Sequence, residues 1–349
     1  MENINVKDSE THFLPEVSPS GKVSHALLKQ WLLDKRPFLS DLLKERGGIV
    51  FRGFKIQSAS DFQELAQIID KDLADRHIFD GAVTFKRTPY VSDVASPDIK
   101  EVLSPLSLHN EDSFVSEVPD KIMFCSLHSA SWGGESLIAD CRKVYEDIPQ
   151  NIQKKYKGQN LKSTLILEDH LFLANSLIPK NLEQIVNFAK AHGAKTVERL
   201  SEEMTRFSFI VPATITSQGG KEVWFNTLHQ AVFYNKCVDI WMAYKMRSGF
   251  LNIFHALLLI FCSLLEDFTV YIRKGRNPLK MHNCTLVNGE YITPWERIQM
   301  GLAFWKNTAI LPLDSGDFFV LNNKLVAHGR MPYKGKRIMV SAMSQPKVV

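Results

Sequence analysis

Apolar residues recur at three- and four-residue spacing in the first part of the chain, which predicts amphipathic helices. Residues 22–47 have this pattern over two helices that end at the glycine pair Gly47 and Gly48. Residues 58–73 open with serines that can cap a further helix, and residues 48–54 between the two regions are typical of a short strand. The beginning of the chain therefore predicts helices beside at least one strand.

The pattern changes to short extended segments, separated by proline and glycine, between about residues 81 and 140. Residues 141–156 return to a helical pattern that Asp140 can cap, and residues 309–343 are again a series of strands. The region in between, about 185–305, is mixed. Strands near both ends, with helices inserted between them, predict an α+β, mainly β fold: a double-stranded β-helix (jelly roll) with flanking and inserted helices.

One apolar segment stands apart from these patterns. Residues 248–265 contain no formal charge and are interrupted only by Asn252, His255 and small polar residues. We expect a buried or interface helix within the fold. A lid helix, a dimer contact and a membrane-surface helix are the alternatives. A transmembrane span is not expected, because it would divide the domain in two.

Composition and charge narrow the class of protein. Hydrophobic residues make up 45% and charged residues 23% of the 349 residues, which is ordinary for a soluble globular protein. The formal net charge of +4 is too small an excess to indicate a nucleic-acid partner. Five cysteines without a Cys-x-x-Cys pair favour free thiols and a reducing compartment. The polar N-terminus lacks the apolar core of a signal peptide, so that a cytoplasmic protein is expected.

Candidate chemistry begins in the stretch SPLSLHNEDSF at residues 104–114. His109 and Glu111 are two positions apart, and on an extended strand such side chains point to the same face. They are either two ligands of one metal ion or a solvated polar face. His328, which follows a buried-looking strand, is the best candidate for a third ligand, and two histidines with one carboxylate form a facial triad that leaves metal positions open.

Groups that could bind a carboxylate accompany these three residues. Arg330 and Arg337 follow His328 closely, and a planar guanidinium can bind both oxygens of a carboxylate. Ser136 could add a hydroxyl donor to the same carboxylate. The other histidines have no partner that would make them ligands and are expected to be surface or core residues; they include His128, His170, His192, His255 and His282.

The order of these motifs resembles a known family. The resemblance covers most of the chain and rests on GGIVFRGF, RTPY, LHNEDSF, MFCSL, GGESLIADCRKVYEDIP, VWFN and GDFFVLNNKLVAHGRMPYKGKRI. Together these segments resemble the taurine dioxygenase and clavaminate synthase-like superfamily of iron(II)/2-oxoglutarate-dependent oxygenases. The details are similar to the branch with glutamate as the carboxylate ligand, which includes amino-acid hydroxylases of secondary metabolism.

The resemblance implies roles for the matching residues. His109, Glu111 and His328 would bind Fe(II), and Arg337 would bind the distal carboxylate of the co-substrate 2-oxoglutarate, with O2 as the second co-substrate. Ser136 stands where the family has a threonine that helps hold that carboxylate. Asn322 stands where the family more often has aspartate, which leaves open how the loop before His328 is supported; Asn323 matches the family.

The substrate and the organisation of the domain are expected as follows. Residues 1–349 would form a single oxygenase domain, with a flexible N-terminus at 1–20 and an inserted lid or substrate-specificity region at 150–290. The resemblance implies hydroxylation of a small molecule, an amino acid that is free or tethered to a carrier protein. Candidate substrate contacts are Arg330, Asn226 and Arg87.

Other functions and partners stay open. Oxygenolytic breakdown of a small sulfonate, ether or amine is the alternative reaction. A catalytically silent jelly-roll interaction module is the alternative from another class. A homo-oligomer is possible, whereas a membrane partner is not expected.

Overall fold

The computed structural model describes residues 4–75, 85–96, 98–168, 182–202, 204–226, 228–229, 233–247, 249–274 and 282–349. Its helices are α1 (His25–Asp34), α2 (Arg36–Arg46), α3 (Ala59–Ile69), α4 (Cys141–Asp147), α5 (Gln150–Tyr156), α7 (Leu182–Ala191), α8 (Phe233–Met246), α9 (Phe250–Lys274) and α10 (Pro294–Lys306). The expected helix ends are present: Ser58 and Asp61 form a reciprocal capping box on α3, and Asp140 caps α4. Gly47 ends α2 with φ 82°, a left-handed conformation that glycine adopts at no steric cost.

Two sheets carry most of the strands. The larger sheet has the order β1 (Ile4–Asp8), β2 (Pro15–Pro19), β3 (Gly48–Phe51), β19 (Phe318–Asn322), β9 (Lys121–His128), β22 (Ile338–Met343), β5 (Val91–Asp93) and β4 (Lys86–Thr88). The smaller sheet has the order β18 (Thr308–Leu311), β11 (Ser136–Asp140), β20 (Val326–Arg330) and β7 (Leu106–His109), all antiparallel. In both sheets, strands near the C-terminus lie between strands from earlier parts of the chain: β19 lies between β3 and β9, and β20 lies between β11 and β7.

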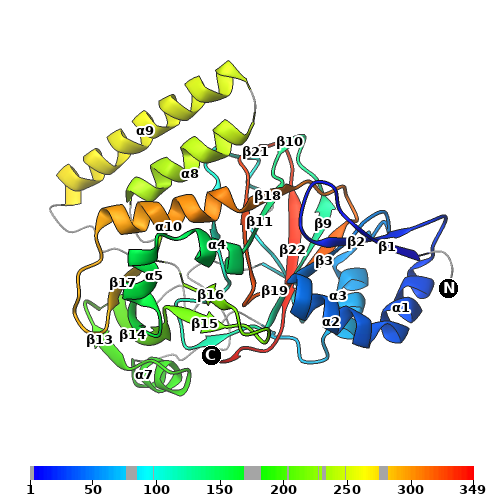
Figure 1. Ribbon diagram of the computed structural model, residues 1–349, viewed down its shortest axis with the longest axis horizontal. Helices are drawn as coiled ribbons and strands as arrows, with labels where there is room; N and C mark the ends of the chain where they lie inside the picture. Colours follow the sequence, from blue (N-terminus) through cyan, green and yellow to red (C-terminus); the bar gives the residue numbers. More distant parts are fainter. Residues whose placement is uncertain are drawn as a thin grey trace.

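The central strands of the larger sheet are apolar on both faces, because each face is covered. On β19, Phe318 and Val320 pack with helices α1–α3, whereas Phe319 and Leu321 share a core with residues of the smaller sheet such as Leu137. The helices α1–α3 lie beside the larger sheet at one end of the molecule (Figure 1). The opposite face of that sheet, toward the smaller sheet, is where a cavity can form.

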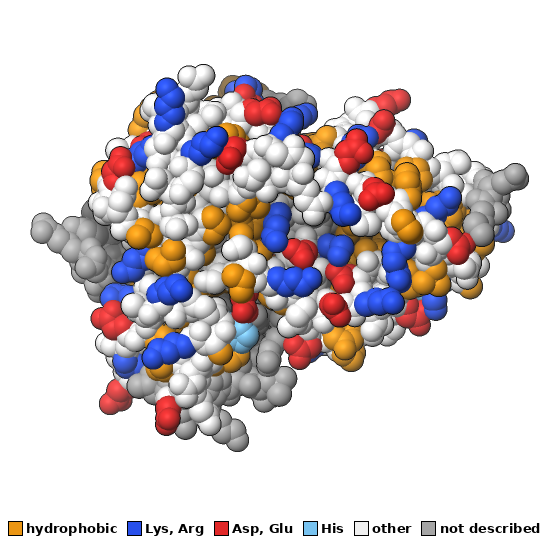
Figure 2. All heavy atoms as spheres, turned by 60° about the horizontal axis from the view of Figure 1, so that its bottom comes forward, with side chains coloured by type: hydrophobic (Ala, Val, Ile, Leu, Met, Phe, Trp, Pro, Cys, Tyr) orange, Lys and Arg blue, Asp and Glu red, His pale blue; other side chains and the backbone are white. Residues whose placement is uncertain are grey.

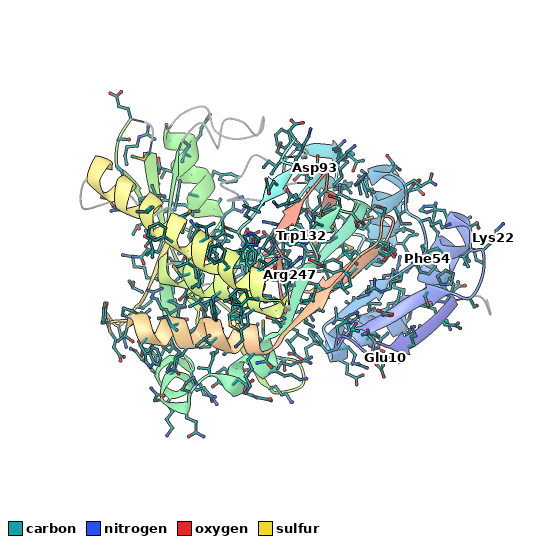
Figure 3. All side chains as sticks on the ribbon, turned by 90° about the horizontal axis from the view of Figure 1, so that it is seen from above. Glu10, Lys22, Phe54, Asp93, Trp132 and Arg247 are labelled. Atoms are coloured by element: carbon teal, nitrogen blue, oxygen red, sulfur yellow. The ribbon has the colours of Figure 1, made fainter. Side chains whose placement is uncertain are left out.

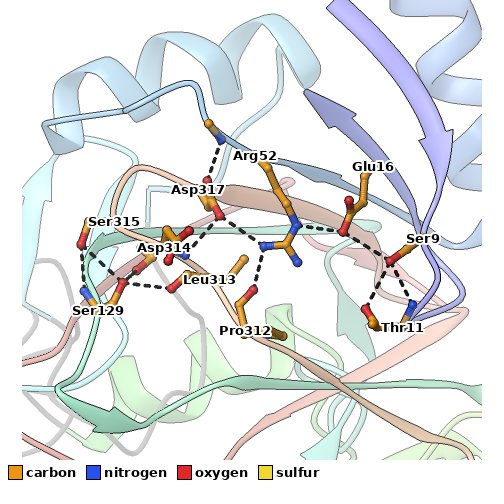
Figure 4. Close-up of polar contacts among 12 residues, drawn as sticks. Ser9, Thr11, Glu16, Arg52, Ser129, Pro312, Leu313, Asp314, Ser315 and Asp317 are labelled. Carbon is orange, nitrogen blue, oxygen red and sulfur yellow. Dashed lines mark hydrogen bonds and ion pairs between the residues drawn. The ribbon is translucent and has the colours of Figure 1, made fainter. Parts of the chain in front are cut away.

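The N-terminal segment is ordered as strands, which corrects the expectation of flexibility for residues 4–19. β1 pairs antiparallel with β2, and β2 pairs parallel with β3. The guanidinium of Arg52 donates to Glu16 (2.8 Å), to the carbonyl of Pro312 (2.8 Å) and to Asp317 (3.3 Å), as Figure 4 shows. These bonds join β2, β3 and the turn before β19, so the first strands belong to the sheet.

The region 150–290 builds a sheet of its own. Its strands run in the order β13 (Thr196–Arg199), β14 (Met204–Pro212), β12 (Asn160–Glu168) and β17 (His282–Leu286). Phe207 and Trp224 from this region belong to the same buried core as Leu137 and Phe319. Its helix α8 packs between α10 and α9, which lies outermost (Figure 1).

Short strand pairs complete the structure. They are β10 (Trp132–Gly133), β21 (Tyr333–Lys334) and β6 (Glu101–Val102) in one sheet, β15 (Thr214–Thr216) with β16 (Glu222–Trp224), and β23 (Lys347–Val348) with β8 (Glu117–Val118). The pairing of β10 with β21 brings Gly133 opposite Tyr333, beside the arginines of the candidate site.

Helix α9 differs from the buried helix expected for residues 248–265. Ala256 is buried, but Phe250 is 82% exposed and Leu251 is 72% exposed. Among the described residues, no helix combines the length and the hydropathy that crossing a membrane requires. Of the expected buried or interface helix, burial within the chain is therefore wrong for the exposed side of α9, and the interface stays a prediction.

Two expectations from composition can be compared with the structure. None of the five cysteines, all of which the structure describes, forms a disulfide. On the face shown in Figure 2, basic and acidic side chains are interspersed rather than gathered by sign. This face therefore has no basic patch of the kind that binds nucleic acid.

Candidate active site

A cavity of about 550 Å3 lies between the two sheets. Phe124, Phe319 and Met339 line it from the larger sheet, and His328 and Ser136 line it from the smaller one. The apolar residues come from alternate positions of their strands, because only one face of a strand can point inward. The cavity thus combines apolar walls with a small set of polar groups.

His109, Glu111 and His328 meet in this cavity. His109 is the last residue of β7 and pairs directly with His328 on β20. The Glu111 carboxylate lies 3.4 Å from Nε2 of His328 and 3.8 Å from Nε2 of His109. One ligand atom from each residue falls within 4.8 Å of the others, a grouping that could hold a metal ion.

The local backbone differs from the extended pairing expected for His109 and Glu111. The strand ends at His109, and Glu111 lies in the turn that follows, where Asp112 has a left-handed φ of 56°. Aspartate tolerates this conformation better than most residues. The turn, rather than strand alternation, therefore brings the carboxylate back over the histidines.

The two imidazoles are suited to bind a metal through Nε2. Nδ1 of His109 lies 2.8 Å from the carbonyl of Ser107 and can only donate to it, which leaves the lone pair on Nε2. Burial, followed by the charge of His328, lowers the pKa of His109 to about 4, so the ring is neutral at physiological pH. Neutral imidazole is the ligand form, and two imidazoles with one carboxylate are the donor set of mononuclear non-haem Fe(II) sites. The residues present fit that ion.

Asn323 holds the backbone of Glu111 from both sides. Its side-chain oxygen accepts from the amide N–H of Glu111 (2.7 Å), and its side-chain nitrogen donates to the carbonyl of Glu111 (2.9 Å). The same nitrogen donates to the carbonyl of Pro119 at 3.0 Å, and Asn323 is fully buried. The asparagine thus fixes the turn that carries the carboxylate.

Replacing Asn323 with alanine is expected to weaken Fe(II) binding by roughly 10- to 100-fold, the usual cost of losing a residue that orients a metal ligand. Asn322→Ala is the matched control, because the Asn322 side chain contacts Leu43 and Lys324 instead of Glu111. Anaerobic equilibrium binding of Fe(II), below the unfolding temperature of both variants, checks the difference. Equal affinities in the two variants would show that Asn323 does not position Glu111.

Ser107 connects the His109 strand to helix α8. Its carbonyl holds His109, and its hydroxyl donates to Asp239 of α8, which also accepts from the indole N–H of Trp305 (2.6 Å). Burial raises the pKa of Asp239 to about 6, although both hydrogen bonds lower it. Sequence reasoning did not find Asp239, because its only sequence signal is one acidic residue within an apolar helix.

Two arginines reach the cavity near the triad. Arg337 donates from Nε to the carbonyl of Gly134 (3.1 Å), and Arg330 donates to the carbonyl of Met331 (2.9 Å). Both guanidinium groups lie over the ring of Tyr333. Ser136 is buried, lines the cavity and pairs with Arg330 across neighbouring strands.

The charge of these arginines is poorly compensated. Within the described part of the chain, neither Arg330 nor Arg337 forms an ion pair. Burial, followed by the charge of Arg330, lowers the pKa of Arg337 to about 10, and burial also lowers the pKa of Arg330. Because charges withdrawn from water are normally paired, these two partly buried guanidinium groups could accept an acidic ligand.

Two predicted substrate contacts lie elsewhere. Asn226 is buried in its own loop, where its amide donates to the carbonyl of Ala213 (2.7 Å) and accepts from the N–H of Leu228 (2.9 Å). The half-exposed side chain of Arg87 binds Asp93 at 2.8 Å, and Asp93 contributes to the cavity lining. Among the described lining residues, neither Asn226 nor Arg87 is present.

The remaining histidines are placed as expected where the structure describes them. His128 is exposed, His192 binds Glu117 at 2.7 Å, and His255 lies on the exposed side of α9. His170 and the side chain of His282 lie outside the described residues. None of the three described histidines approaches the triad.

The outer lining of the cavity comes from a different segment than expected. Phe85, Val94, Ser96, Ile99 and Leu106 contribute to it, whereas no described residue of 150–290 does. The described strands of the region 150–290 pair with one another. Within the described residues, the outer wall of the cavity is therefore formed by residues 85–106.

Comparisons with known proteins agree with this geometry. The family model "Taurine catabolism dioxygenase TauD, TfdA family" matches residues 12–228. The dapdiamide synthesis protein DdaC of Enterobacter agglomerans is 24% identical over 313 residues, which cover 88% of this chain and 85% of that protein. A clavaminate synthase-like protein of Arabidopsis thaliana is 24% identical over 60% of this chain and 66% of that protein.

Solved structures share the fold. A putative α-ketoglutarate-dependent taurine dioxygenase from Burkholderia xenovorans aligns with a TM-score of 0.53 at 10% identity, over 99% of this chain and 93% of that one. AAD-2, solved in complex with Mn(II) and N-oxalylglycine, aligns with a TM-score of 0.52 at 11% identity, over 99% of this chain and all of that one. At such low identity the likeness concerns the fold.

Proposed function

Because the chain belongs to the TauD, TfdA family of dioxygenases, we propose that it hydroxylates a small acidic molecule, an amino acid that is free or tethered to a carrier protein. Enzymes of this family use Fe(II), 2-oxoglutarate and O2, and this chain is a 2-oxoglutarate-dependent dioxygenase acting on a small molecule. The class of substrate and the type of oxidation are the proposed parts. The similarity to DdaC, a dapdiamide synthesis protein, supports a role in biosynthesis.

The residues of the cavity have the following proposed roles. His109, Glu111 and His328 hold the iron, which supplies the oxidising chemistry when it is bound. Arg337, with the hydroxyl of Ser136 beside it, binds the distal carboxylate of 2-oxoglutarate and sets its orientation. The apolar walls, including Phe124 and Phe319, exclude water from the reacting groups. The fold that holds these residues is proposed to be a double-stranded β-helix in a single domain.

One observation carries the proposed substrate class: Arg330 is a second guanidinium that lines the cavity without an ion pair among the described residues. If Arg337 takes the distal carboxylate of the co-substrate, Arg330 is left for an acid group of the substrate. A charge-assisted hydrogen bond in such a site contributes about 1.5–3 kcal/mol. A free amino acid has the required carboxylate, whereas its amide and an amino acid tethered through its carboxyl group do not, so this observation favours the free form.

Replacing Arg330 with glutamine tests this role. We expect KM for an acidic substrate to rise roughly 10- to 150-fold, the equivalent of one lost charge-assisted bond, with little change in the affinity for 2-oxoglutarate. The test screens amino acids against their amides by substrate-stimulated succinate formation. Arg87→Gln is the control, because Arg87 does not line the cavity. A substrate that is turned over equally well as acid and amide would refute the role of Arg330.

Oxygenolytic breakdown of a small sulfonate, ether or amine remains the second candidate. It is favoured by the likeness in fold to dioxygenases of taurine and of 2,4-D. Arg330 would bind a sulfonate as it would a carboxylate. Mass spectrometry of the products, with small sulfonates added to the screen, separates the two candidates, since breakdown releases a fragment of the substrate and hydroxylation retains all its carbon atoms. The cytoplasmic location and the carrier protein stay predictions.

A further inference from the structure

Helix α9 has an uncovered apolar stripe, formed by Leu251, Phe254, Leu258, Phe261 and Leu265. These residues are spaced alternately by three and four positions, and their exposed fractions range from 48% to 72%. A seven-residue repeat of this kind places all five side chains along one side of a helix. It is the spacing by which one helix packs against another helix.

The other side of α9 is already used. Ala256 and Ser263 are buried, and Ala256 packs with Ile240 and Tyr244 of α8 in a small separate core. The helix is therefore apolar on nearly its whole circumference, a property of helices that are covered on all sides. Within the described structure only the side toward α8 has a covering element.

The exposed area has the size of a protein interface. Nine large apolar side chains between Phe250 and Leu265 are 40% to 82% exposed. Since an aromatic side chain buries about 150–250 Å2, their exposed area is on the order of 800 Å2. Each partner in a standard interface contributes about 800 Å2, whereas monomers rarely expose contiguous apolar patches beyond about 300–600 Å2.

The charge pattern distinguishes a protein partner from a membrane surface. Between Arg247 and Glu266 the sequence contains no Asp, Glu, Lys or Arg. Helices that lie on membranes carry Lys and Arg along a polar face, whereas the second face of α9 is packed on α8. A uniformly apolar stripe instead complements an identical stripe, as the same surface does in a two-fold dimer.

We propose that the stripe of α9 is the interface of a homodimer, in which the α8–α9 pairs of two copies form a four-helix contact. This interface does not depend on the identity of the substrate. It would lie on the helix pair α8–α9, and α8 also contacts the candidate site. From α8, Asp239 bonds Ser107, and Arg247 at its end pairs with Glu135 and stacks on Trp132, with 4.2 Å between guanidinium carbon and ring centre (Figure 3).

Light scattering after size-exclusion chromatography tests the proposal on the full-length protein. The wild type at micromolar concentration is expected at twice the 39.8-kDa chain mass. The double variant Leu258→Glu, Phe261→Glu is expected at the monomer mass, with a dissociation constant raised at least 100-fold and an unchanged circular dichroism spectrum. Leu33→Glu on α1 is the matched control, since Leu33 is 46% and Leu258 48% exposed. A monomeric wild type, or a double variant that stays dimeric, would overturn the proposal.

Thiol cross-linking gives a second measurement that needs no disruptive substitution. Cys262 is exposed beside the stripe, whereas Cys125, Cys141 and Cys284 are buried. A bis-maleimide should produce cross-linked dimers in the wild type, and Cys262→Ser should abolish them.

Flotation with anionic phospholipid vesicles tests whether α9 binds a membrane surface instead. If the wild type is a monomer that binds the vesicles, and the double variant does not bind them, the stripe is a membrane-binding surface and the dimer proposal is refuted.

Discussion

Replacing His328 with alanine is expected to abolish 2-oxoglutarate turnover and to lower Fe(II) affinity by more than the roughly 10- to 100-fold that loss of a ligand-orienting residue costs. The reason is geometric: His328 supplies one of three ligand atoms, and its Nε2 lies 3.4 Å from the Glu111 carboxylate. The two remaining ligands cannot form a facial triad. Anaerobic Fe(II) binding and succinate formation measure the two effects.

His192→Ala is the matched control for this experiment. His192 also lies close to a glutamate, 2.7 Å from Glu117. It directly follows α7 and is not among the described residues that line the cavity. Its replacement should leave Fe(II) binding and turnover unchanged. Full activity in the His328 variant would contradict the assignment of the metal site, whereas loss of activity in both variants would point to a general effect on folding.

Replacing Arg337 with glutamine is expected to weaken 2-oxoglutarate binding severely while Fe(II) binding persists. Truncating one partner of a buried, hydrogen-bonded charge pair costs about 2–5 kcal/mol. The Kd for 2-oxoglutarate should therefore rise by about thirtyfold or more. Arg337 lines the cavity, and burial is the first cause of its lowered pKa. Anaerobic calorimetry with 2-oxoglutarate on the iron-loaded protein measures the change.

Arg206→Gln removes a guanidinium of the same chemistry from an exposed pair with Glu198, and it should not affect 2-oxoglutarate binding. An Arg337 variant that binds 2-oxoglutarate as tightly as the wild type would move the co-substrate to another group, with Arg330 the first candidate. A variant that also loses Fe(II) would indicate that Arg337 acts through the metal site.

The sequence was sufficient to predict which residues meet in the cavity, because their motifs are local and occur in a recognisable order. His109 and Glu111 are two positions apart, and His328 and Arg337 lie within one short segment. The backbone geometry that brings the ligands together was not predictable from these motifs. Strand alternation requires one extended segment through His109 and Glu111, but Glu111 lies in a turn after the strand.

Contacts between distant segments account for what the sequence did not predict. Asn323 holds the backbone of Glu111 across 212 positions of sequence, and Asp239 reaches Ser107 across 132. No local pattern encodes such a pairing. For the same reason the sequence did not predict that the described strands of the region 150–290, expected to contain a lid or substrate-specificity region, pair with each other. Similarly, the apolar composition of residues 248–265 predicted a buried or interface helix, but not which of its sides would pack on α8.

The most direct test of the central claim is an anaerobic titration of the metal-free protein, first with Fe(II) and then with 2-oxoglutarate, followed by visible absorption. If the cavity holds both groups, a charge-transfer band should appear only after both additions, and it should be lost in His109→Ala and in Arg337→Ala. Iron binding without a band in the wild type would contradict the claim, because the metal and the co-substrate would then not share the site between the two sheets.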